Sequence, residues 1–121
     1  MAEVATPHRE VSRGVVAIYK DYMGRGPEHA ATTIAGDTVL TVCRGGLTRA
    51  ESRLVEAGDA ETVRQIRRKF QDAMRDEIRK LVEDVTGRKA HAFLSDHDVE
   101  RDLAIEVVLL EAEPVAEAQA A

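Results

Sequence analysis

The sequence has a single cysteine, Cys43, and no tryptophan. One cysteine excludes an intramolecular disulfide framework and a zinc site built on cysteine pairs. Aromatic residues make up 3% of the chain, so a core must be built mainly from Val, Ile, Leu and Ala. The longest strongly apolar run, residues 107–110, is far shorter than the ~20 residues that a membrane-spanning helix needs. We therefore predict no direct membrane span.

Positive charge is also scarce: 17 Lys and Arg residues stand against 22 Asp and Glu residues, a net charge of −5. This balance argues against a general nucleic-acid binder. The basic segment from Arg64 to Lys69 has no aromatic residues on which bases could stack, so we predict no nucleic-acid partner. The first residues lack the charged-then-apolar layout of a signal peptide. We predict a soluble, cytoplasmic protein that reaches a membrane only through a partner.

The strongest helical pattern covers residues 59–86. Apolar residues recur there in steps of three and four, which places them on one stripe of a helix. Asp59 suits the N-cap, and Gly87 suits a left-handed residue after the last turn. At 1.5 Å per residue this helix is about 40 Å long, more than the width of a compact domain of this size. The remaining chain must wrap the helix or leave part of it for a partner.

The other predicted elements are shorter. They are a helix over residues 9–23, strands over 29–35 and 38–44, a helix opened by Thr48 and Glu51 as a capping box, and strands over 89–94 and 103–110 around a polar turn, 95–102. The order α-β-β-α-α-β-β predicts an α+β fold, with a four-stranded, mainly antiparallel sheet packed on one long helix and two shorter helices. Two separate small sheets are the alternative. We predict disorder in residues 1–8 and 113–121 and a single domain over residues 9–112.

Three segments together resemble a known family. They are IYKDYMGRGP (residues 18–27), GGLTRAE (45–51) with LVEAG (54–58), and TGR (86–88) followed by AFLSD (92–96). In this order, over about residues 10–112, they are similar to the MpsC-like family, small bacterial proteins formerly grouped as a domain of unknown function. The resemblance implies a soluble accessory protein, associated with a sodium-translocating, membrane-potential-generating system linked to inorganic-carbon uptake. It supplies no catalytic residues. We predict a non-enzymatic accessory or regulatory protein with a membrane-transporter partner.

Two glycine-rich loops are candidate anion-binding sites. The first joins a strand to a helix N-terminus, where free amides and the helix dipole favour negative charge. The second follows the first helix. The residues concerned are Arg44, Gly45, Gly46, Thr48 and Arg49 in the first loop, and Lys20 and Arg25 at the second. The glycines and Thr48 are equally explained as a turn and a cap. The alternative function is a small-anion or nucleotide-binding domain, or a small enzyme, although the Gly-x4-Gly-Lys-Ser/Thr pattern is missing.

Metal binding and catalysis have weaker support. His91, Asp96, His97 and Asp98 are potential ligands, but aspartates in a turn usually bond their own backbone. No Ser-His-Asp signature, His-Glu-x-x-His motif or cysteine pair is present. Cys43 lies in an apolar strand, where a thiol is inert. We predict no metal, no cofactor and no catalytic residue.

The charges of the long helix predict self-association. Its first half is mainly basic and its second half mainly acidic, so the helix complements an antiparallel copy of itself. We predict a homodimer. Its interface is predicted to include Arg64, Arg67, Arg68, Phe70, Met74 and Glu77.

Overall fold

The computed structural model describes residues 6–112. They form α1 (Pro7–Met23), β1 (His29–Ala35), β2 (Thr38–Arg44), α2 (Arg49–Glu56), α3 (Ala60–Thr86), β3 (Ala90–Asp98) and β4 (Leu103–Leu110). The predicted α+β class and element order are confirmed. The disorder predicted for residues 1–5 and 113–121 lies outside the described residues. α1 begins at Pro7, so residues 6–8, predicted as disordered, belong to the helix and its cap.

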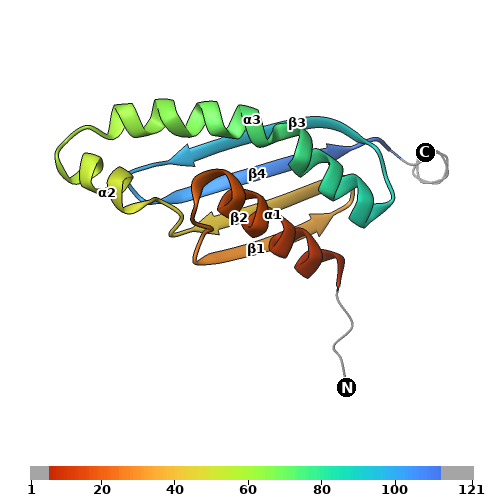
Figure 1. Cartoon of the computed structure of the whole chain (residues 1–121). Coiled ribbons are helices and arrows are strands. Elements are labelled where there is room, and N and C mark those ends of the chain that lie inside the picture. Colours follow the sequence, from red (N-terminus) through yellow and green to blue (C-terminus); the bar gives the residue numbers. More distant parts are fainter. Residues whose placement is uncertain (1–5, 113–121) are drawn as a thin grey trace, which may run out of the picture.

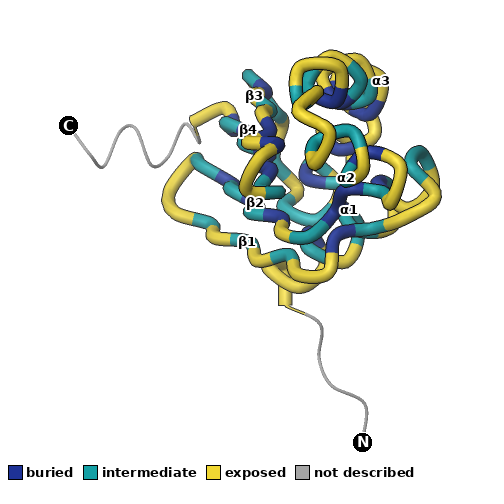
Figure 2. The backbone as a smooth tube through the Cα atoms, turned by 90° about the vertical axis from the view of Figure 1, so that its left-hand side faces the viewer, coloured by how far each residue is buried: buried dark blue, intermediate teal, exposed yellow. Residues whose placement is uncertain are grey.

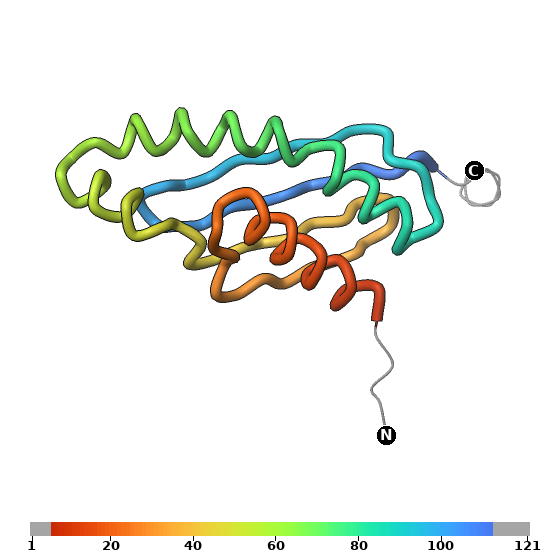
Figure 3. Tube along the Cα trace, viewed as in Figure 1, coloured from red at the N-terminus to blue at the C-terminus, as the bar shows by residue number. Residues whose placement is uncertain are grey.

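The four strands form one sheet in the order β1-β2-β4-β3, with every neighbouring pair antiparallel. The two most apolar strands, β2 and β4, pair at its centre, which joins the two hairpins into one sheet (Figure 3). The central strands thus have both edges hydrogen-bonded, while the Ala- and Thr-rich β1 and the polar β3 lie at the edges. The alternative of two separate sheets is wrong.

All three helices cover the same face of the sheet (Figures 1 and 2). α1 packs on β1, α3 packs on β3, and α2 packs against the first part of α3. The strand residues that face the helices alternate with those that face away, as the pleat requires. The main core joins Val11, Val15 and Tyr19 of α1, Met74, Ile78 and Val82 of α3, and Val39, Cys43, Phe93, Ala104, Val108 and Leu110 of the sheet.

Gly14 lies where α1 meets α3. A Cβ atom at this position would lie 2.5 Å from both methyl carbons of Leu81 on α3. Glycine weakens the helix by about 1 kcal/mol relative to alanine. Here it allows the two helices to approach closely.

β3 is longer than predicted. The sequence indicated a strand ending at Leu94 and a polar turn over residues 95–102, but the strand continues to Asp98 and the turn is confined to residues 99–102. Ser95 and His97 face the helices, whereas Asp96 and Asp98 are exposed. Ser95 pairs with Glu106 of β4, and His97 pairs with Ala104. This strand pairing outweighs the polar composition of residues 95–98, which is typical of a turn.

Candidate functional site

The turn between β2 and α2 is held by a carboxylate from the other end of the chain. Asp102, in the β3–β4 turn, accepts hydrogen bonds from the amides of Gly46 at 3.1 Å and of Leu47 at 3.1 and 3.2 Å. Its carbonyl accepts a third from Gly45 at 3.1 Å. Two of the amides at the predicted anion site therefore already bind a carboxylate of the same chain.

Beside this turn lies a buried ion pair, Arg67 with Glu51. The Arg67 guanidinium donates to the two carboxylate oxygens of Glu51 at 2.8 and 2.6 Å and to the carbonyl of Gly46 at 2.7 Å. Only 1% of the Arg67 side chain and 6% of the Glu51 side chain are exposed. Burial alone would raise the pKa of Glu51, but the bonds and charge of Arg67 and the amide of Thr48 outweigh it and lower that pKa. The pair is therefore ionised at neutral pH.

Glu51 has a second role as the capping-box residue of α2. Its carboxylate accepts from the amide of Thr48 at 2.8 Å, while the Thr48 hydroxyl accepts from the amide of Glu51 at 3.2 Å. The start of α2 is thus joined through Glu51 to Arg67 in α3. The capping box was predicted from the sequence; the bond to Arg67 was not.

His97 is the buried neighbour of Asp102. It is buried on β3, and its Nε2 lies 3.5 Å from a carboxylate oxygen of Asp102. Burial and the positive charge of Arg67 lower the pKa of His97, so its imidazole is neutral at neutral pH. We name Glu51, Arg67, His97 and Asp102 the turn cluster. Because it comes from four separate elements or turns, it ties α2, α3 and the second hairpin to the turn at residues 45–47.

A second polar group lies in the middle of the main core: Tyr19 and Glu106, which we name the buried pair. The Tyr19 hydroxyl of α1 donates to a carboxylate oxygen of Glu106 in β4 at 2.5 Å. Glu106 is 2% exposed, and burial raises its pKa to about 7. Burial and then the charge of Glu106 raise the pKa of Cys43 to about 12, so the thiol stays protonated. The sequence did not identify either member of this pair.

The two predicted anion loops lie against each other. Arg25 donates to the carbonyl of Gly45 at 3.1 Å and pairs with Glu28 at 3.3 Å. Arg44, Arg49 and Lys20 are exposed. Asp102 already binds the amides of Gly46 and Leu47. An anion at this place would therefore be bound by guanidinium groups and not by these amides. Anion binding by these residues stays a prediction.

The four residues weighed as metal ligands are spread over both faces of β3. His97 points into the turn cluster, whereas Asp96 and Asp98 are exposed. Within residues 6–112, no three His, Cys, Asp or Glu side chains are grouped as a metal would require. None of the helices in this part of the chain combines the length and apolar composition needed to cross a bilayer.

Removal of the Asp102 carboxylate tests the role of the turn. We expect Asp102→Ala to lower the free energy of unfolding by about 2 kcal/mol, because buried amides lose a charged acceptor. Sulfate or phosphate at millimolar concentration should restore part of the melting temperature by binding the freed amides. Asp98→Ala, which removes a carboxylate from the other end of the same turn, should not respond to the anion.

The opposite result would favour the anion site predicted from the sequence. If phosphate stabilises the wild type as strongly as Asp102→Ala, and Arg49→Ala removes that gain, the arginines bind an anion without the amides. Differential scanning fluorimetry against phosphate, sulfate and nucleotides measures both cases.

The residues predicted for a dimer interface on α3 divide into two groups. Arg67 and Met74 are 1% and 0% exposed and face the chain's own core. Arg64, Arg68, Phe70 and Glu77 remain at least partly accessible. Of these, Arg64 pairs with Glu61 at 2.9 Å and Glu100 at 3.1 Å. A second copy on α3 could contact only the accessible residues.

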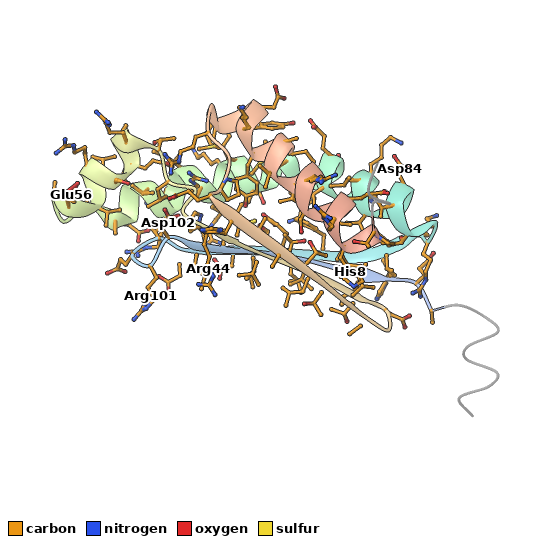
Figure 4. All side chains as sticks on the ribbon, turned by 90° about the horizontal axis from the view of Figure 1, so that it is seen from below. His8, Arg44, Glu56, Asp84, Arg101 and Asp102 are labelled. Atoms are coloured by element: carbon orange, nitrogen blue, oxygen red, sulfur yellow. The ribbon has the colours of Figure 1, made fainter. Side chains whose placement is uncertain are left out.

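The sheet presents one face to solvent: the outer face, the side that no described helix covers (Figure 2). Figure 4 shows its side chains projecting away from the helix layer. Its large apolar members come from β2, β3 and β4. They are Leu40, Val42, Leu94, Leu103, Ile105, Val107 and Leu109.

Comparison with known proteins gives one family. Residues 6–112 match the family model described as Na+-translocating membrane potential-generating system (MpsC). The chain is also 29% identical over 90 residues to the uncharacterized protein YbcI of Bacillus subtilis, an alignment that covers 72% of this chain and 71% of YbcI. No solved structure matches significantly. Because the family model spans almost all the described residues, the chain belongs to the MpsC family.

Proposed function

We propose that this protein is a non-enzymatic, cytoplasmic accessory subunit of a Na+-translocating membrane-potential-generating system, and that it works as a homodimer which docks on a membrane-transport partner. The outer face is the observation that carries this proposal. Contiguous apolar patches on a protein surface are often sites of association. Family membership supports the choice of system.

The polar clusters support a binding role over a chemical one. Asp102 binds the turn amides, Arg67 binds Glu51, and Tyr19 binds Glu106. In each case the polar group that could bind a substrate is already bonded to another residue of the chain. These contacts stabilise the fold and fix its loops.

The transport partner is proposed to contact the solvent side of α3. Arg68 and Lys69 are exposed in its first half, and Asp76 and Asp84 in its second half. Such charges orient a partner and accelerate its association more than they add to final affinity. The Na+-translocating system would therefore be recognised through complementary charge.

Affinity purification from cross-linked cells tests this docking. The tagged wild type should enrich an integral membrane subunit of the Na+-translocating system from solubilised membranes. Arg68→Glu combined with Lys69→Glu should reduce that enrichment about tenfold, a loss of ~1.4 kcal/mol. Arg13→Glu combined with Lys20→Glu, an equal charge change on exposed positions of α1, is the matched control.

Two outcomes would remove the proposed docking. One is a wild type that never enriches a subunit of this system. The other is an equal loss with the α1 and α3 variants, since it would indicate a general charge effect without a specific surface.

A further inference from the structure

The outer face carries large apolar side chains on the strands β2, β4 and β3. Leu94 is 60% exposed and Ile105 is 36% exposed, the two most exposed large hydrophobic residues of the described chain. Strand pairing places Leu94 beside Val107 and Ile105 beside Val42, so the patch is continuous across the sheet. β1 extends it with small residues, Ala31 and Ala35 among them.

The size of this face is close to what a stable interface needs. Four strands about 4.8 Å apart, each rising about 3.4 Å per residue over seven residues, cover roughly 19 by 24 Å. Pairing two such faces would bury roughly 900 Å² of projected area, and side chains make the accessible area larger. Stable interfaces exceed about 1,000 Å² in total, counted over both partners.

Among the strand residues that point to the outer face, charge lies toward one end and is divided by sign. Arg44 on β2 and His29 on β1 pair with each other in the strand register. On the other side of the same end, β3 carries Asp96 and Asp98, which pair with Ile105 and Leu103 of β4. One corner is therefore basic and the neighbouring corner acidic. Figure 4 labels Arg44 at this end, together with the β3–β4 turn that bears Arg101.

This division selects one arrangement of two identical sheets. A two-fold axis parallel to the strands, between β2 and β4, places the basic corner of each copy over the acidic corner of the other. An axis across the strands would instead place charged ends over the apolar ends that contain Ala35 and Leu109. Opposite charges across an interface favour the first arrangement, since like charges or unpaired charges on apolar surface are costly.

We propose that a second copy of this chain covers the outer face, with its sheet packed on the first across a two-fold axis parallel to the strands. The inference rests on the homodimer of the proposed function and names its surface and symmetry. Two twisted sheets packed this way lie about 10 Å apart and about 30° off alignment. Arg44 and Asp98 both pair with Leu103, so they lie at the same level along the strands, and this axis places Arg44 of each copy nearest to Asp98 of the second copy. α3 faces outward on both sides, available to the transport partner.

Sedimentation velocity from 1 to 100 µM tests the surface. We expect the wild type to be dimeric, and Ile105→Lys and Leu94→Lys each to raise the dissociation constant at least 100-fold, because a charge would be buried at the apolar contact. Leu94 is on an edge strand and mostly exposed, so its variant should keep the monomer fold, as circular dichroism would verify. Arg68→Glu with Lys69→Glu, on α3, should leave the dimer unchanged.

A charge swap tests the symmetry axis. Arg44→Glu should weaken the dimer about tenfold, and adding Asp98→Arg should restore it, since the pair would then be reversed across the interface. Failure of the swap to restore affinity would overturn the parallel axis.

Other outcomes separate this inference from the proposed function. A dimer broken by the α3 variant and unaffected by Leu94→Lys would overturn the sheet contact and leave the homodimer in place. A monomeric wild type at 100 µM would overturn both. A monomer that binds phosphatidylglycerol vesicles, and loses this binding with Leu94→Lys, would assign the outer face to a lipid surface instead.

Discussion

Arg67→Met should lower the free energy of unfolding by about 3–5 kcal/mol, as measured by urea unfolding at pH 7. Methionine fills similar space without a charge, so Glu51 would remain ionised and buried without its cation. The carbonyl of Gly46 would also lose its donor at 2.7 Å. This is the loss typical of breaking one side of a buried ion pair.

The double variant Arg67→Met with Glu51→Gln should regain most of that loss. Glutamine is neutral and can still act as the third residue of the capping box, so Thr48 keeps its partner. Arg68→Met, at the exposed neighbouring position, should change the stability by less than about 0.5 kcal/mol. A double variant as unstable as Arg67→Met alone would show that packing, rather than the unpaired Glu51 charge, causes the loss.

The inward stripe of α3 was visible in the sequence but was partly misassigned. Buried residues on this helix fall at Val63, Arg67, Gln71, Met74 and Ile78, in steps of four and three that continue to the end of the helix. The spacing predicted the helix and its face correctly. Arg67 and Gln71 occupy stripe positions, yet their polarity suggested a surface location. Periodicity indicates which residues point inward; only tertiary structure provides the partner that makes a buried arginine stable.

The turn at residues 45–48 illustrates the same limit. The sequence identified its glycines, its cap and its position before a helix, all of which are local features. It did not identify Asp102 as the carboxylate that fills the turn, since this residue follows Leu47 by 55 positions. The pairing of β4 beside β2 brings them together, and strand order depends on the whole sheet. The extension of β3 through Ser95 and His97 was missed for the same reason.

The outer face was partly predictable. The sequence of residues 103–110 has apolar residues on both faces of the strand, which indicates partial cover on both sides. Within residues 6–112, the helices cover one side only (Figure 1). The sequence prediction of a homodimer placed the contact on the long helix because its charges are conspicuous there. Apolar area provides the larger part of association energy, and it is concentrated on the sheet.

Glu106→Gln should make the protein less dependent on pH between about 4.5 and 7. The pKa of Glu106 is raised from an ordinary value of 4.5 to about 7 because the carboxyl is buried. In this pH range the folded state holds a proton that the unfolded state has released, so wild-type stability falls as the pH rises. Ionising Glu106 in the folded protein costs about 3 kcal/mol at pH 8, from ~1.4 kcal/mol per pKa unit. The glutamine variant, which avoids this cost and can still accept from Tyr19, should then be the more stable protein by a few kcal/mol.

The difference between the two proteins isolates Glu106 from the other acidic groups. Glu51 acts in the opposite direction, since its pKa is lowered and its contribution is lost on acidification, but it is present in both proteins. Tyr19→Phe is the second comparison: the Tyr19 hydrogen bond lowers the pKa of Glu106, so its removal should extend the loss of stability to higher pH. Urea unfolding at pH 4.5, 6, 7 and 8 measures the stability of the wild type, Glu106→Gln and Tyr19→Phe. A constant difference between Glu106→Gln and wild type over this range would mean that Glu106 does not titrate within it. The buried pair would then be a permanently neutral or permanently charged part of the core.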